Sequence, residues 1–322
     1  MTGPRRIVVA LGGNALQRRG ESLDVGHLQA NVTRAAEAIA ALCDDDTQLV
    51  VTHGNGPQVG LLALQAEAYR DVPPYPLDVL GAESEGMIGY LLDQHLSAEL
   101  PDRRVATLLT QVVVSPHDPA FAAPTKPIGP VYPAADAERL ARERGWSTAP
   151  DGDGVRRVVP SPTPGRIVEL PTIRLLLDHG TVVVCAGGGG IPVLNGAAGL
   201  RGVEAVIDKD ATAAVVARDL GADALLILTD VPAVRTGWAS PSARAILRAS
   251  PEALRRFTFA AGSMGPKVTA ACRFVQETGH RAAIGRLEDA AALLAGTAGT
   301  QILPRVPLAL APDPAPQAAG HS

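Results

Sequence analysis

The chain alternates between short, almost continuously apolar runs and longer stretches in which apolar residues recur at helical spacing. The runs are rich in Val, Ile and Leu and have the length of strands that are buried on both faces, as in a parallel sheet flanked by helices. They predict strands at residues 7–11, 48–52, 105–114, 181–185, 224–228 and 281–284.

The stretches between these runs predict helices at residues 26–42, 58–69, 81–100, 172–179, 210–220 and 267–278. Because strands and helices alternate, right-handed crossovers between parallel strands are expected. The predicted fold class is therefore α/β: an open α/β/α sandwich with a mainly parallel central sheet and a small protruding subdomain.

Two segments interrupt the alternation. Residues 115–164 are rich in Pro and Gly and contain one helix-like piece at 134–144 and a turn at 151–154. This segment is too long for an ordinary connection, so it is the predicted protruding subdomain. Residues 304–322 are rich in Pro and Ala without periodicity and are expected to form a disordered tail.

Composition narrows the classes of function. A net charge of −4 and only 3% aromatic residues argue against a nucleic-acid-binding surface. Three isolated cysteines, Cys43, Cys185 and Cys272, support neither a disulfide framework nor a zinc site. No signal peptide and no apolar segment long enough for a membrane span are recognisable, so a cytoplasmic protein without membrane partners is expected.

Lysine is the rarest charged residue, with three copies against 26 arginines. The three are Lys126, Lys209 and Lys267, and each stands in a distinctive motif: Pro-Thr-Lys-Pro-Ile-Gly-Pro, Asp-Lys-Asp and Gly-Ser-Met-Gly-Pro-Lys. A compact ammonium group on a flexible stem suits contact with a phosphoryl group better than a planar guanidinium does. We therefore expect a polyanion site assembled from three separate segments, although chance within an arginine-biased composition would also leave a few lysines.

Three predicted strands end in glycine-rich loops, at residues 11–15, 52–58 and 186–192. Ligands of open α/β sheets bind at the carboxyl ends of strands, where glycine lets backbone N–H groups approach an anion. The P-loop signature, the dinucleotide fingerprint and the protein-kinase motifs are all missing, so phosphate binding must use another arrangement.

These motifs together resemble the carbamate kinases of the amino-acid kinase superfamily. The resemblance runs from about residue 6 to 303 and rests on residues 8–15, 53–60, 109–114, 126–130, 158–162, 187–193, 202–210 and 262–267. It implies the reversible reaction ATP + carbamate = ADP + carbamoyl phosphate, with Mg²⁺ carried by the nucleotide phosphates, and a homodimer. Residues 1–221 are expected to form the carbamate-binding lobe and residues 222–303 the nucleotide-binding lobe.

The resemblance also implies roles for single residues. Lys209 should bind the phosphoryl group in transit, Lys267 the β- and γ-phosphates, and Lys126 should reach over the acceptor. Asp210 is expected to orient the lysines. The expected substrate-binding residues are Gly12, Gly13, Asn14, Gly54, Asn55, Gly187, Gly188 and Arg156. The expected nucleotide-binding residues are Thr229, Asp230, Val231, Gly262, Ser263, Met264 and Lys267.

Other readings of these residues stay open. Asp210 would also serve as a helix cap, Asp208 as a cap or a local salt-bridge partner, and Arg156 as an exposed hairpin residue. His53 is expected to orient its loop, because carbamate is already an oxyanion and its attack needs no general base. Two alternatives for the whole chain are a sister kinase with another acceptor and a nucleotide-binding regulator without catalysis.

Overall fold

The computed structural model describes residues 5–17, 21–22, 24–69, 71–237, 240, 242–260 and 262–312. Its centre is a nine-stranded sheet with the order β15-β12-β14-β13-β11-β1-β2-β8-β3. The strands are β1 (Arg5–Leu11), β2 (Thr47–His53), β3 (Val105–Thr107), β8 (Val182–Val184), β11 (Ala224–Thr229), β12 (Ile246–Ala249), β13 (Arg281–Arg286), β14 (Thr300–Ile302) and β15 (Ala309–Leu310). The six strands from β13 to β3 run parallel. The predicted mainly parallel sheet is confirmed.

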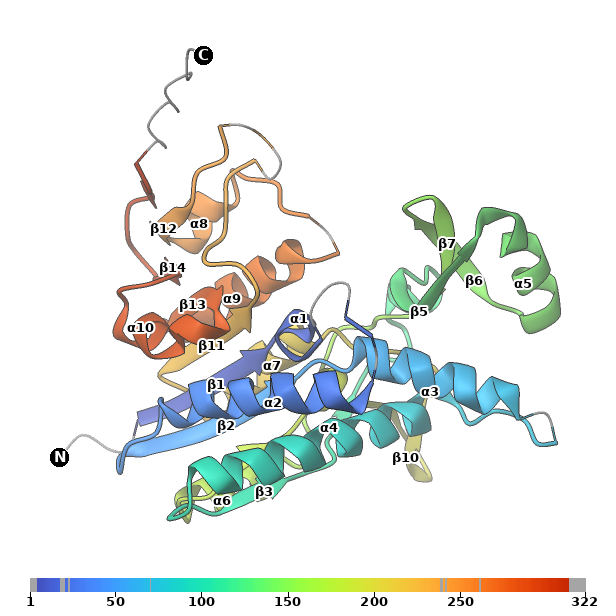
Figure 1. The fold of residues 1–322 in the computed structure, drawn as a ribbon, viewed down its shortest axis with the longest axis horizontal. Coiled ribbons are helices and arrows are strands. Elements are labelled where there is room, and N and C mark those ends of the chain that lie inside the picture. Colours follow the sequence, from blue (N-terminus) through green and yellow to red (C-terminus); the bar gives the residue numbers. More distant parts are fainter. Residues whose placement is uncertain are drawn as a thin grey trace.

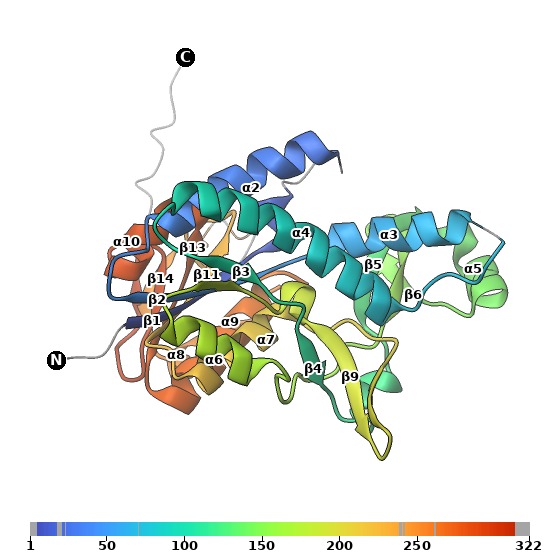
Figure 2. The same cartoon turned by 90° about the horizontal axis from the view of Figure 1, so that it is seen from below.

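Helices cover both faces of this sheet, as Figure 2 shows. One layer holds α1 (Gly13–Leu16), α2 (Val25–Ala40), α4 (Leu77–Glu99) and α10 (Ala290–Ala295), and the other holds α6 (Leu170–Asp178), α7 (Lys209–Leu220), α8 (Pro251–Leu254) and α9 (Met264–Thr278). Successive side chains of β1 pack into the hydrophobic cores on opposite faces of the sheet. Val8 contacts the layer of α7 and α9, whereas Ile7 and Val9 contact the layer of α2 and α4. This is why the strand sequences are continuously apolar.

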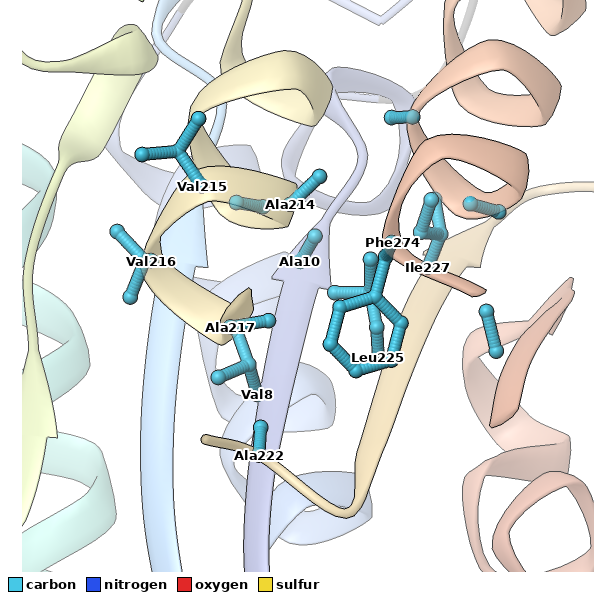
Figure 3. Packing of buried hydrophobic residues seen from close by; sticks show 14 of the residues in the cluster. Val8, Ala10, Ala214, Val215, Val216, Ala217, Ala222, Leu225, Ile227 and Phe274 are labelled. Atoms are coloured by element: carbon cyan, nitrogen blue, oxygen red, sulfur yellow. The ribbon is translucent and has the colours of Figure 1, made fainter. Parts of the chain in front are cut away.

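Small and large side chains are matched where α7 and α9 meet the sheet. Figure 3 shows Ala217 of α7 above Val8 of β1, and Phe274 of α9 beside Leu225 of β11. Alanine lets the α7 backbone approach the strands closely. Phe274 is fully buried, and the loss of such a ring typically costs about 3–5 kcal/mol. This packing fixes α7 and α9 against the sheet.

The protruding subdomain forms a separate three-stranded sheet, drawn in green in Figure 1. It consists of β5 (Lys126–Pro133), η2 (Ala134–Asp136), α5 (Ala137–Arg144), β6 (Ser147–Asp151) and β7 (Gly154–Val159), after the short η1 (Pro119–Phe121). Beside it lies α3 (Gly56–Ala68). A Cβ on Gly60 of α3 would come 2.7 Å from Gly129 Cα in β5, so the two backbones touch. Absence of a side chain at Gly60 thus sets how closely the subdomain docks.

The single strand predicted at 105–114 is two strands in different sheets. After β3 the chain leaves the large sheet, and β4 (Gln111–Val113) pairs instead with β9 (Ile191–Gly196), whose hairpin partner is β10 (Gly199–Gly202). The break falls at Thr110, which is buried. Its N–H donates to Glu85 Oε2, and its Oγ1 accepts a hydrogen bond from the Ala186 N–H. Periodicity in a continuous apolar run contains no signal for such a change of partner.

The structure corrects the expected disordered tail for residues 304–312. Within it, β15 pairs antiparallel with β12, and the Ala311 N–H donates to the Ala245 carbonyl at 2.8 Å. The backbone thus gains sheet hydrogen bonds that a Pro/Ala-rich composition does not signal. The remainder of the expected tail, residues 313–322, lies outside the described residues.

The predicted boundary between residues 221 and 222 falls at the turn between α7 and β11. Because β11 pairs with β1, the two parts share one sheet and one core. Their separate assignment to carbamate and to nucleotide stays a prediction. None of the described helices has the length and apolarity that crossing a membrane requires.

Candidate active site

Four parallel strands, β11, β1, β2 and β8, lie next to one another and end at the same edge of the sheet. Their loops therefore line that edge in the same order: Thr229–Val231, then Gly12 and Gly13, then Gly54 and Asn55, then η3 (Gly187–Gly189). This edge is where ligands of open α/β sheets bind. Residues that are far apart in sequence are thus brought into one row.

All three lysines converge on the first turn of α7. Lys126 Nζ lies 2.7 Å from Asp208 Oδ2, Lys209 Nζ lies 2.5 Å from Asp210 Oδ1, and Lys267 Nζ lies 3.0 Å from Asp210 Oδ2. The lysines come from three different elements: the start of β5, the start of α7 and the first turn of α9. One Asp-Lys-Asp tripeptide therefore holds the only three lysines of the chain together.

The helix start explains why this tripeptide has that shape. Asp208 is the N-cap of α7: its Oδ1 accepts hydrogen bonds from the N–H groups of Asp210 at 3.0 Å and Ala211 at 3.1 Å. Its other oxygen pairs with Lys126. Asp208 therefore both caps a helix and makes a long-range ion pair. Asp210 instead occupies the first turn, where the positive end of the helix dipole favours a carboxylate.

Burial makes these charges interdependent. Burial alone would raise the pKa of Asp210, but the ammonium groups of Lys209 and Lys267 lower it to about 2. Burial lowers the pKa of Lys209 to about 8, against the opposing effect of Asp210. Burial would also raise the pKa of Asp208, and Lys126 holds it below its usual value. The cluster thus combines three lysines with two aspartates, one basic group more than acidic groups.

The second glycine loop packs against both the first loop and Lys209. A Cβ on Gly54 would lie 3.1 Å from Gly13 Cα and 3.2 Å from Lys209 Cδ. A Cβ on Gly12 would lie 2.8 Å from the carbonyl oxygen of Leu228, at the end of β11. Any side chain at these positions would therefore push the loops apart or displace the lysine. The side chain of Asn14 lies outside the described residues.

The four-glycine loop closes the other side of the row. A Cβ on Gly188 would overlap the side-chain amide of Asn55, at 2.1 Å from Nδ2. Thr212 of α7 donates from Oγ1 to the Gly189 carbonyl at 2.9 Å, which ties the loop to the lysine-bearing helix. Gly187, Gly188 and Asn55 are therefore brought together, as their expected common role requires.

The expected nucleotide residues lie on the other side of β1. Thr229 ends β11 and donates from Oγ1 to Asp230 Oδ1 at 3.1 Å, with Val231 next along the chain. Gly262 and Ser263 precede α9, and Met264 begins it, so the first-turn Lys267 points from that helix to Asp210. Lys267 thus connects this half of the row with the glycine loops.

Arg156, one of the expected substrate-binding residues, pairs with a residue of its own hairpin in the subdomain. It lies on β7 of the subdomain, opposite Val131 in β5, and its Nε is 2.9 Å from Asp151 Oδ2 of the same hairpin. Two further residues were not foreseen: Asp208 as the partner of Lys126, and Glu85, whose buried carboxyl accepts a hydrogen bond from Gly187 N–H. The Asp208-Lys209-Asp210 motif held a signal for the first, whereas Glu85 lies unremarked within a helical run.

This arrangement suits the transfer of a highly charged group between two anions. Ammonium groups and backbone amides neutralise charge on transferring oxygens without moving a proton. His53 is fully buried at the end of β2, and burial lowers its pKa to about 4. It is closed off from solvent, and its Nδ1 lies 3.3 Å from the Gly54 carbonyl oxygen, which supports an orienting role.

Comparison with known proteins places the chain in a family. The family model described as "Amino acid kinase family" matches residues 5–286. Carbamate kinase from Haemophilus influenzae is 55% identical over 299 residues, covering 92% of this chain and 96% of that protein, and carbamate kinase from Pyrococcus furiosus is 45% identical, covering 93% and 99%. The solved structure of carbamate kinase from Giardia lamblia bound to AMP-PNP superposes with a TM-score of 0.87 at 39% identity, covering 95% of this chain and all of that one. The chain belongs to the amino acid kinase family, in its carbamate kinase branch.

Proposed function

We propose that this chain catalyses the reversible transfer of a phosphoryl group between ATP and carbamate, giving ADP and carbamoyl phosphate. The observation that carries the proposal is the convergence of Lys126, Lys209 and Lys267 on two carboxylates beside three glycine loops. The carbamate kinases to which the chain is similar support the choice of acceptor. The Giardia lamblia relative, whose structure is bound to AMP-PNP, supports the choice of donor.

In this proposal each lysine neutralises negative charge at a different point of the phosphoryl transfer. Lys267 neutralises the β- and γ-phosphates, Lys209 follows the phosphoryl group in transit, and Lys126 contacts the acceptor side from the subdomain. Asp210 holds the first two ammonium groups at a fixed spacing. The amides of Gly12, Gly13 and Gly54 cradle the oxygens that move. Carbamate enters as an anion, so its oxygen attacks phosphorus without a general base.

Mg²⁺ with ATP or ADP is part of the proposal. The carboxylates nearest the candidate phosphate site, Asp208 and Asp210, are both paired with lysines. These residues fit an ion that arrives on the nucleotide phosphates. When bound, it would supply further neutralisation of charge on the phosphate oxygens.

The direct test measures ATP formed from ADP, Mg²⁺ and carbamoyl phosphate by luminescence. Lys209→Ala is expected to lower kcat about 100-fold or more, because one preorganised stabilising group is removed from the transition state. Arg142→Ala serves as the matched control: its side chain is 73% exposed on α5. No ATP from the wild type, or equal rates from Lys209→Ala and Arg142→Ala, would sink the proposal.

A second variant tests why lysine is used. Lys126→Arg keeps the charge but replaces the compact ammonium beside Asp208 by a planar guanidinium. We expect kcat to fall about 10-fold as the larger head group displaces the start of β5, an effect of about 1.4 kcal/mol. Wild-type kcat in this variant would show that charge alone matters at position 126.

We also propose a homodimer and a cytoplasmic location. Exposed apolar side chains on and near α4, namely Met87, Tyr90 and Leu109, support a contact between copies. Light scattering is expected to give twice the monomer mass of 33.2 kDa. Tyr90→Glu is expected to shift the population toward monomer, and a monomeric wild type would refute this part. Dependence on ATP and ADP supports the cytoplasmic location.

A further inference from the structure

Glu85 is a buried carboxyl group in the middle of α4, and only 1% of the residue is exposed. Its Oε1 accepts a hydrogen bond from the Gly187 N–H at 2.7 Å, and its Oε2 accepts one from the Thr110 N–H at 3.3 Å. Burial raises its pKa to about 8. Burying a carboxyl group costs free energy of folding, so the two hydrogen bonds of Glu85 indicate a specific role for this residue.

One of these contacts holds a strained turn. Ala186, just before the four glycines, has φ of +51°, the only positive φ among the described non-glycine residues. A left-handed alanine costs about 1–2 kcal/mol and persists only where its surroundings hold it. The Ala186 N–H donates to Thr110 Oγ1 at 2.9 Å, and the next N–H, that of Gly187, donates to Glu85. The start of the loop is thus held by two side chains from other elements.

The neighbouring residue of α4 holds the other acceptor-side loop. Asn55 Nδ2 donates to Ser84 Oγ at 2.7 Å, and Ser84 is fully buried. Because Ser84 and Glu85 are consecutive, one turn of α4 is bonded both to the loop after β2 and to the loop after β8. The two loops meet where a Cβ on Gly188 would overlap the Asn55 amide.

His53 fills the space under the same loop. A Cβ on Gly187 would lie 2.3 Å from His53 Cε1 and 2.9 Å from Glu85 Cγ, so both side chains pack against Gly187. The His53 Nδ1 faces the Gly54 carbonyl at 3.3 Å, while its buried Nε2 has no hydrogen-bond partner in the described part of the chain. Burial keeps His53 neutral, with its pKa lowered to about 4. The underside of the loops is therefore formed by buried side chains whose pKa shifts favour their neutral forms.

We propose that Ser84 and Glu85 are positioning residues for the acceptor half of the active site. They set the spacing between the Gly54-Asn55 loop and the Gly187-Gly188 loop, and thereby the shape of the pocket that takes carbamate or carbamoyl phosphate. The nucleotide half is built on β11 and α9, so we expect it to be independent of Ser84 and Glu85. This inference rests on the proposed function.

The test separates the two halves of the site kinetically. Glu85→Met keeps length and removes both acceptors, Glu85→Gln keeps one acceptor oxygen, and Ser84→Ala removes the partner of Asn55. Unmet buried N–H groups are costly, so we expect Glu85→Met to raise KM for carbamoyl phosphate about 10-fold or more, with Glu85→Gln and Ser84→Ala intermediate. KM for ADP is expected to stay at the wild-type value. Glu83→Gln, an exposed carboxyl on the same helix, is the control.

A second measurement is independent of activity. Hydrogen exchange is expected to speed up in residues 186–190 of Glu85→Met and in residues 54–56 of Ser84→Ala, and to stay unchanged in Glu83→Gln. Unchanged KM for carbamoyl phosphate, or equal rises of KM for both substrates, overturns the inference, as does unchanged exchange in both loops. An inactive wild type with the expected exchange pattern would instead reject the proposed function and leave the positioning role supported.

Discussion

Asp210 is the single carboxylate between two ammonium groups, and its removal is the sharpest test of how the lysine cluster is held. Asp210→Asn keeps the shape of the side chain and removes its charge. In the wild type the two contacts are 2.5 and 3.0 Å long, and the side chains of all three groups are at most 14% exposed. At an effective dielectric constant near 20, each contact has a gross attraction of about 6 kcal/mol.

The expected net loss is smaller, because the two ammonium groups regain some hydration and the asparagine oxygen still accepts a hydrogen bond. Removing one partner of a buried ion pair typically costs about 3–5 kcal/mol, and we expect the lower end, about 3 kcal/mol. With an unfolding entropy of about 2.1 cal/mol/K per residue, this lowers Tm by about 4 °C for a chain of this length.

The assay is thermal unfolding at neutral pH, with Asp178→Asn as the control. Asp178 is 61% exposed and lies 3.5 Å from Arg6, so its loss should leave Tm unchanged. The pKa of Asp210 is lowered from 3.8 to about 2, so its stabilisation is fully present above pH 4 and is lost as pH falls toward 2. The Tm difference from wild type should therefore shrink over that window.

A polyanion should partly replace the missing charge. Pyrophosphate or AMP-PNP is expected to raise the Tm of Asp210→Asn more than that of the wild type, because it meets two ammonium groups that have lost the charge of Asp210. A variant that melts with the wild type at neutral pH, or that gains no more from pyrophosphate than the wild type, would refute the reasoning.

The remaining predictions concern the lysines and the subdomain. Burial lowers the pKa of Lys209 to about 8, so the kcat/KM of the wild type should fall tenfold per pH unit above pH 8. Lys209→Arg should abolish that fall. A wild-type profile that stays flat to pH 10 would contradict the prediction. Gly60→Ala would place a Cβ 2.7 Å from the Gly129 backbone, so the subdomain must shift and both kcat and Tm should fall. Gly81→Ala, with open space at its Cβ, is the control. Asp208→Asn keeps the cap of α7 but loses the Lys126 pair, so kcat should fall with little loss of stability, which rate and melting measurements on one preparation will check.

Sequence patterns were most informative where local physics dominates. Five of the six predicted strands and all six predicted helices correspond to observed elements, because a strand buried on both faces is apolar throughout and a helix is amphipathic over several turns. Patterns failed where a partner decides the structure. The run at 105–114 divides between two sheets, and the short β12 and β15 are strands only because each has a neighbour to pair with.

The same distinction applies to the candidate site. The rarity of lysine and the glycine motifs indicated the candidate site residues. The resemblance of the chain to the carbamate kinases was confirmed by the comparisons. The individual roles stay predictions. Arg156 was grouped with the substrate residues from its motif, whereas its observed partner is Asp151 of its own hairpin.

The family, the fold class and the three candidate lysines could be predicted from the sequence alone, because they depend on residue types, spacing and local periodicity. Only the tertiary structure decided that Lys126, Lys209 and Lys267 share one Asp-Lys-Asp turn, and that Ser84 and Glu85 hold two loops from beneath. Contacts between distant segments, such as that of Glu85 with Gly187, 102 residues apart, depend on the register of the parallel strands. That register follows from packing of the whole sheet, which no local pattern contains.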